Sequence, residues 1–227
     1  MSGTVRSLLI SLLCLTSVAS ADHVILTGGP AMRRWENYRV PDDQHDRWWA
    51  NFVRASTLRM DEIRRAYGPN APIVWMIYRP GYANRGGEDH QPYTTWLSQV
   101  AAQRHATLVW VDGGPELINA INSRPRGSIE TFDYFGHSNR FCFMLDYGNH
   151  IMAACTAWLH ENDVSKIHSS VFARNAYCKS WGCHTGESMS QKWKSAIGIP
   201  LEGANGKTDY TVVSKGQLPA VDGGWVR

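Results

Sequence analysis

Two short segments pair a glycine with a side chain that can do acid–base or nucleophilic chemistry. Gly136-His137 and Gly182-Cys183 each come at the end of an apolar run. Glycine lets the backbone turn sharply and lets a substrate approach closely. An imidazole within roughly 3–4 Å of a thiol can take its proton and produce a nucleophilic thiolate. If the two runs are neighbouring strands, the pattern predicts His137 as a base and Cys183 as a nucleophile.

Each residue also has an ordinary structural explanation. A cysteine at a strand end is commonly a small buried hydrophobe or half of a disulfide, and a lone histidine commonly lies at the surface or in the core. Their order is more specific. All nine histidines lie at or before His184, which excludes for Cys183 the papain-like order with a histidine far downstream. His137 precedes Cys183 by about 46 residues, close to the roughly 50 that separate this pair in caspases.

The segments around these residues resemble a known family. DYFGHSN (133–139) and AYCKSWGCHTG (176–186) are similar to the histidine and cysteine blocks of caspase-like cysteine peptidases, each of which follows a sheet strand. SMSQKWKSAIGIPLEGANGKTDY (188–210) is similar to the helix and strand that follow the nucleophile in bacterial members. The resemblance extends from the first strand at Val24 to about Tyr210, with specific motifs only in the later part.

This resemblance implies a secreted endopeptidase with a caspase-like three-layer sandwich fold, a polypeptide substrate and no metal or cofactor. His137 matches the base and general acid, and Cys183 matches the nucleophile that forms a thioester. The backbone N–H groups of Ser138 and Cys183 match the oxyanion hole, and Gly136 and Gly182 match the supporting turns. The family's usual His-Gly is His137-Ser138 here, and Gly182 replaces the usual alanine before the cysteine. These departures leave both an active peptidase and an inactive relative open.

A serine hydrolase is the second enzyme hypothesis. Gly136 to Arg140 nearly fits the G-x-S-x-G nucleophile elbow, with Ser138 as the nucleophile of an esterase or lipase. Asp146 or Asp163, followed by His168 or His184, would complete the order Ser, Asp, His. Arg140 in place of the closing glycine, and the extended apolar chain that follows it, count against this hypothesis.

Two further hypotheses concern metal and ligand binding. Cys178, Cys183 and His184, with His160 or His168, are ligand types that zinc uses, but their spacing is not that of zinc fingers or ribbons.

Among disulfides, Cys142 with Cys155 is favoured over Cys178 with Cys183, because strand residues five apart are too distant to be bridged. Ten Trp and nine Tyr also permit a non-catalytic secreted binding domain, although core packing is the usual role of such residues.

The elements expected to hold these residues alternate along the chain. Apolar or β-rich runs predict strands at 23–29, 72–78, 106–111, 129–135, 141–147 and 171–181, and helical spacing predicts helices at 46–67, 95–105, 115–122, about 150–168 and from 188 onward. Ser188 to Gln191 has capping-box spacing, and the positive end of that last helix would favour a thiolate at Cys183. Alternation of this kind predicts an α/β fold, a mainly parallel sheet with helices on both faces.

Residues 1–21 have the pattern of a secretory signal peptide, with one positive charge, a short apolar run and Ala19-Ser20-Ala21 at the expected cleavage point. An uncleaved anchor is the alternative. Cleavage would leave residues 22–227 as one soluble domain outside the cytoplasm, without stable membrane insertion. The content of 43% apolar residues argues against a disordered chain, and a net charge of +3, spread along the sequence, does not indicate a nucleic-acid partner.

Overall fold

A seven-stranded sheet forms the centre of the protein. The computed structural model describes residues 21–41, 44, 46–148 and 155–227. The strand order is β12-β9-β8-β4-β1-β2-β3, and all neighbours are parallel except β12, which runs antiparallel to β9. The strands are β1 (Asp22–Thr27), β2 (Ile73–Tyr78), β3 (Ala106–Val111), β4 (Ile129–Phe135), β8 (Phe172–Ser180), β9 (Leu201–Ala204) and β12 (Trp225–Val226). All six residues of β1 and of β2 are buried, as expected for strands that helices cover on both faces.

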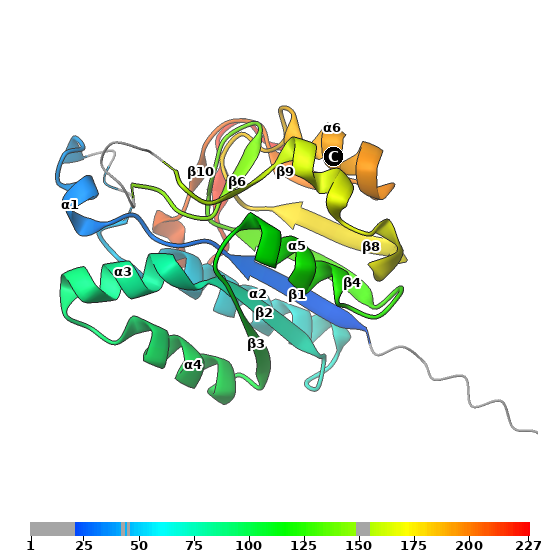
Figure 1. The fold of residues 1–227 in the computed structure, drawn as a ribbon, viewed down its shortest axis with the longest axis horizontal. Coiled ribbons are helices and arrows are strands. Elements are labelled where there is room, and N and C mark those ends of the chain that lie inside the picture. The colour runs from blue at the N-terminus through cyan, green and yellow to red at the C-terminus, as the bar shows by residue number, and fades with distance from the viewer. Residues whose placement is uncertain (1–20, 42–43, 45, 149–154) are drawn as a thin grey trace, which may run out of the picture.

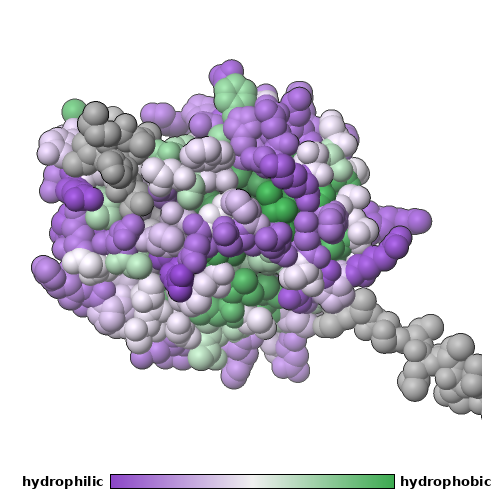
Figure 2. Space-filling view, in the orientation of Figure 1, coloured by the Kyte–Doolittle hydropathy of each residue, from purple (hydrophilic) through white to green (hydrophobic). Residues whose placement is uncertain are grey.

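Helices cover both faces of this sheet and complete a three-layer α/β architecture (Figure 1). One apolar core lies between the sheet and α5 (Gly114–Asn122) with α6 (Met189–Ile197). The other lies between the sheet and α2 (Asn51–Tyr67), α3 (Arg79–Asp89) and α4 (Tyr93–Gln103). The predicted α/β class with helices on both faces is therefore confirmed. The face of the molecule in Figure 2 is mostly hydrophilic, and apolar residues show at its centre, around α5.

Several predicted elements differ from the observed ones in their bounds. The helix expected from residue 46 begins at Asn51, because residues 46–50 form a turn that holds Asp46 in a buried position. The helix expected at 95–105 is α4, two residues earlier at each end. The strand expected at 141–147 is reduced to β6 (Cys142–Met144), which lies in a small three-stranded sheet between β5 (His137–Ser138) and β7 (Trp158–His160).

Two expectations about local structure are wrong. Residues 155–168 do not continue a helix, since they contain β7 and a 3₁₀ helix over Glu161–Lys166, followed by another over Ser169–Val171; residues 149–154 lie outside the described part. Pairing with β6 buries Leu159, which gives this segment a period of two instead of 3.6. The Ser188 side chain does not cap α6, because its hydroxyl donates to Glu161 Oε2 at 2.6 Å.

The sequence patterns did not predict α3. Its sequence RPGYANRGGED holds three glycines and shows no apolar periodicity, so neither helix propensity nor amphipathicity identifies it. Other short elements also escape the patterns, among them α1 (Arg33–Glu36) and the paired strands β10 (Thr208–Asp209) and β11 (Ala220–Val221), with a 3₁₀ helix at Thr211–Lys215 between these strands.

The predicted signal peptide lies outside the described residues except for Ala21, which directly precedes β1. Within the part of the chain that the structure describes, no helix has both the length and the apolar character that crossing a membrane requires.

Candidate active site

Two neighbouring strands bring the predicted pair to one edge of the sheet. β4 and β8 are parallel, and their register places Tyr134 opposite Ser180. The Trp181 N–H continues this pairing with a 2.8 Å hydrogen bond to the Tyr134 carbonyl oxygen. His137 and Cys183 therefore follow the carboxyl ends of adjacent strands, where α/β sheets carry their ligand sites.

The loops that carry His137 and Cys183 are in direct contact. The Ser138 hydroxyl donates a 2.7 Å hydrogen bond to the Cys183 carbonyl oxygen. A Cβ atom added to Gly182 would lie 2.2 Å from Ser138 Oγ, and one added to Gly136 would lie 2.4 Å from the Tyr134 hydroxyl. Neither glycine has a positive φ. Glycine is therefore needed at 182 for the close approach of the two loops, and at 136 to leave room for the Tyr134 side chain of the same strand, and at neither position for a left-handed turn.

A buried carboxylate that the sequence analysis did not identify supports His137. Asp46 Oδ2 lies 2.6 Å from His137 Nε2 and also accepts the Ala31 N–H at 2.6 Å. Burial acts to raise the pKa of Asp46, but the charge and hydrogen bond of His137, the Ala31 N–H and Arg85 outweigh it and hold this pKa below its usual value. Asp46 is therefore ionised at neutral pH. Since a carboxylate only accepts, the imidazole proton lies on Nε2 and Nδ1 is left available.

The imidazole of His137 is also fixed by ring contacts. Phe52, at the start of α2, meets it edge-on with ring centroids 5.0 Å apart, and Tyr147 lies at 4.6 Å. Phe52 is itself in contact with Tyr210, whose ring meets the Phe52 ring edge-on with centroids 5.0 Å apart. The His137 side chain keeps 15% of its surface exposed, so the imidazole is held in place and still reaches solvent.

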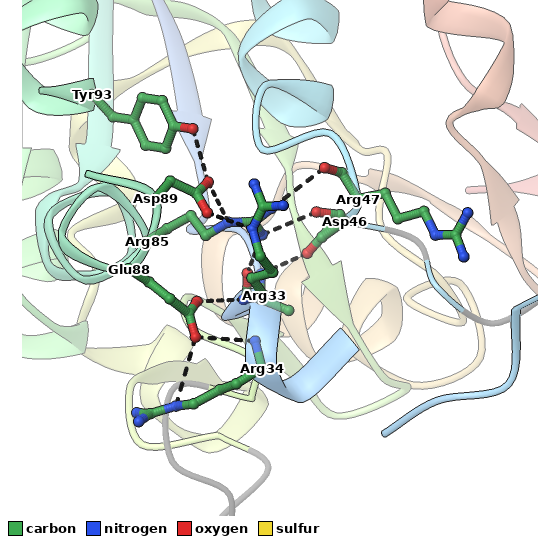
Figure 3. Close-up of polar contacts among 9 residues, drawn as sticks. Arg33, Arg34, Asp46, Arg47, Arg85, Glu88, Asp89 and Tyr93 are labelled. Atoms are coloured by element: carbon green, nitrogen blue, oxygen red, sulfur yellow. Dashed lines mark hydrogen bonds and ion pairs between the residues drawn. The ribbon is translucent and has the colours of Figure 1, made fainter. Parts of the chain in front are cut away.

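Arg85, from α3, holds the backbone around Asp46 (Figure 3). Its guanidinium is buried and donates to the carbonyl oxygens of Ala31, Asp46 and Arg47 at 2.7, 3.0 and 3.3 Å. Asp89 Oδ2 accepts the Arg85 Nε–H at 2.8 Å, and this partner sits one turn further along the same helix. The helix that sequence patterns missed thus fixes the carboxylate behind His137.

Thr208 contacts the sulfur of Cys183. The Thr208 backbone N–H points at Cys183 Sγ at 3.3 Å, and Thr208 Oγ1 lies 3.3 Å from the same sulfur. Thr208 is the first residue of β10, on a segment some 25 residues after the cysteine. Residue types and spacing gave no signal for this contact.

A groove of about 580 Å³ runs past His137. One wall is the turn before α2 with Asp46 and Trp48, and the other is the β10 segment with Thr208 and Asp209. This volume suits a few residues of an extended peptide or a small ligand. A second cavity of about 550 Å³ beside α5 is lined by neither His137, Ser138 nor Cys183, although Asp163 is part of its wall.

The serine-hydrolase hypothesis requires Ser138 to sit on a strand-to-helix turn, with an aspartate available to a histidine. Ser138 lies in β5, an extended segment that pairs with β6, and not in a strand-to-helix elbow. Its hydroxyl is engaged with Cys183. Asp146 is buried and accepts hydrogen bonds from the backbone N–H groups of Thr156 and Ala157, so its role is structural.

The cysteines and histidines proposed as metal ligands do not converge either. Among the described residues, no group of three or more His, Cys, Asp or Glu side chains is placed to hold a metal ion. Cys142, Cys155, Cys178 and Cys183 are all free thiols, so the favoured disulfide between Cys142 and Cys155 is not formed. His184 instead pairs with Glu187 at 2.5 Å.

The tryptophans are divided between core and surface. Trp75 and Trp193 are fully buried, whereas Trp48, Trp96 and Trp158 are exposed on three different segments: the turn before α2, α4 and β7.

Comparison of the chain with protein-family models, with curated proteins and with solved structures finds no match in any of the three.

Proposed function

We propose that the protein is a cysteine peptidase of the caspase-like type, exported from the cytoplasm, in which His137 and Cys183 form the catalytic dyad. The observation that carries this proposal is that both residues follow neighbouring parallel strands, on loops joined by the hydrogen bond from Ser138 to the Cys183 carbonyl. The adjoining groove supports an extended polypeptide substrate. Export rests on the signal-peptide pattern of residues 1–21.

Acylation begins when His137 Nδ1 takes the proton from the Cys183 thiol. The thiolate attacks the carbonyl carbon of the scissile peptide bond, and the resulting oxyanion accepts hydrogen bonds from the backbone N–H groups of Ser138 and Cys183. The carbon–nitrogen bond then breaks as Nδ1 returns its proton to the leaving amine. The products of this half-reaction are a free amine and a thioester on Cys183.

Deacylation uses the same groups in reverse. His137 Nδ1 takes a proton from water, the hydroxide adds to the thioester carbonyl, and the carbon–sulfur bond breaks. The proton on Nδ1 returns to the sulfur of Cys183. Asp46 keeps its charge throughout, orients the imidazole and stabilises the imidazolium that forms in each half-reaction.

The test is covalent labelling with a peptide acyloxymethyl ketone, which reacts with catalytic thiols. We expect wild-type protein to be labelled at Cys183, as located by peptide mass mapping, and Cys183→Ala and His137→Ala to lose the label. Cys142→Ala is the matched control, because its thiol is part-buried and burial raises its pKa to about 11, so it stays protonated at neutral pH. Absence of labelling in the folded wild type would refute the peptidase proposal.

A serine-directed fluorophosphonate separates the second hypothesis. Labelling by that probe which is lost only in Ser138→Ala would favour the serine hydrolase. We expect no such labelling, because the Ser138 hydroxyl is already bonded to the Cys183 carbonyl.

A further inference from the structure

The nucleophile of the proposed dyad has two hydrogen-bonding groups of one residue directed at its sulfur. The Thr208 N–H and Thr208 Oγ1 both lie 3.3 Å from Cys183 Sγ. A backbone N–H can only donate, so at least this contact favours a sulfur that carries negative charge. The hydroxyl can donate or accept, and its role depends on which state of the sulfur predominates.

Hydrogen bonds to the cysteine loop and to β11 hold the segment that contains Thr208 in place. The His184 N–H donates to the Gly206 carbonyl at 2.7 Å, and the Gly206 N–H donates to Glu187 Oε1 at 3.3 Å. On its other side, Thr208 pairs with Val221 in the β10–β11 ribbon. These contacts keep Thr208 against the sulfur before any substrate is bound.

We propose that Thr208 is a positioning residue that stabilises the thiolate formed when Cys183 loses its proton, by donating both its N–H and its O–H to the sulfur. The proposal rests on the proposed function, since it assigns Cys183 as the nucleophile. It adds a component that no sequence motif marked. Two donors directed at a developing or resident negative charge stabilise it relative to the neutral thiol.

The substitution must leave unchanged the titratable groups on the elements near the cysteine loop, of which Tyr134 and Tyr210 interact electrostatically with Cys183. His137 comes from β5, Tyr134 from β4 and Tyr210 from the residue after β10. Burial raises the pKa of Tyr210 well above its usual value, and a negative charge on Cys183 raises it further. His184 and Glu187 lie on the cysteine loop itself, and Asp46 lies behind His137. A change from threonine to valine at 208 alters the charge of none of them.

The experiment is the pH profile of Cys183 alkylation by iodoacetamide in the full chain, read at this cysteine by peptide mass mapping. Thr208→Val removes the hydroxyl and keeps the β-branched shape and the N–H. Thr208→Ser keeps the hydroxyl, and Thr107→Val is the matched control on the edge strand β3. Thermal unfolding of each variant verifies that it is folded.

We expect Thr208→Val to move the midpoint of the profile to higher pH by about one unit, a tenfold loss of alkylation rate below the midpoint. Thr208→Ser and Thr107→Val should keep the wild-type profile. An unchanged or lowered midpoint in folded Thr208→Val would overturn the proposal, because the hydroxyl then does not donate to a thiolate. Alkylation does not require peptidase activity. A shifted midpoint in a protein that the acyloxymethyl ketone does not label would therefore support the role of Thr208 and refute the peptidase.

Discussion

A buried histidine in the first strand should make the protein lose stability as the pH falls from about 6.5 to about 4. His23 lies in β1, 1% exposed, with Nδ1 3.1 Å from Thr131 Oγ1 and its ring 4.3 Å from that of Tyr67. Burial, with a smaller effect of the positive charge of Arg59, lowers the pKa of His23 from 6.5 to about 4, against the opposing charge of Asp22. The folded protein therefore keeps this imidazole neutral.

The size of the effect follows from the shift. A difference of 2.5 pKa units at 1.36 kcal/mol per unit gives about 3 kcal/mol. In the unfolded chain His23 binds its proton near pH 6.5, so between the two pKa values the unfolded state holds more protons and the free energy of unfolding falls as the pH falls. Above about pH 6.5 the full contribution is present, and below about pH 4 it is lost.

Urea unfolding followed by tryptophan fluorescence at pH 7.0, 5.5 and 4.5 measures this contribution. His23→Gln retains an amide that can bond to Thr131 and does not titrate, so between pH 7.0 and 4.5 it should lack about 2.4 kcal/mol of the pH dependence seen in the wild type. His168→Gln, at an exposed position, is the control and should keep the full dependence. Equal pH dependence in wild type and His23→Gln would refute the assignment of a neutral buried imidazole.

Three other substitutions test the supporting contacts. Asp46→Asn should lower the rate of Cys183 labelling by about 10–100-fold, because a hydrogen bond to a charged group is worth about 1.5–3 kcal/mol. Asp163→Asn is the control, and an equal labelling rate in the two variants would contradict the role of the Asp46 carboxylate. Gly182→Ala should destabilise the protein by about 1–3 kcal/mol in urea unfolding, and Ser138→Gly in the same chain should recover most of this loss; additive effects would show that the two positions are independent. Asp22→Asn should cost about 2 kcal/mol, because Arg124 and Ser128 lose a buried carboxylate at 2.8 and 2.7 Å, and a midpoint of denaturation within error of the wild type would contradict this.

The sequence was most informative where a strand is covered on both faces. β2 is a continuous apolar run and β1 contains one at 24–26, and the predicted positions of β1, β2 and β4 agree with the observed ones within a residue or two. Such runs are reliable because burial on both faces admits few polar residues. The segment at 155–168 was misjudged because short apolar runs fit a helix and a strand equally well until their pairing partners are known.

The sequence was enough to select His137 and Cys183 as candidate residues, but not the residues that hold His137 in place. His137 and Cys183 stand out because each ends a predicted strand with a glycine before it. Asp46 looked like an acidic residue at the start of a helix, and nothing in its neighbours distinguished it from a surface carboxylate. Its burial depends on Arg85, which belongs to a helix without amphipathic pattern. Contacts between distant segments of this kind leave no periodic trace in the sequence.

The close contact between Ser138 and Gly182 ties the residue types at these two positions to each other. The serine hydroxyl fills the room that a methyl group at 182 would need. A larger residue at 182 therefore requires a smaller one at 138. In homologues of this chain the residue after the histidine and the residue before the cysteine should vary together.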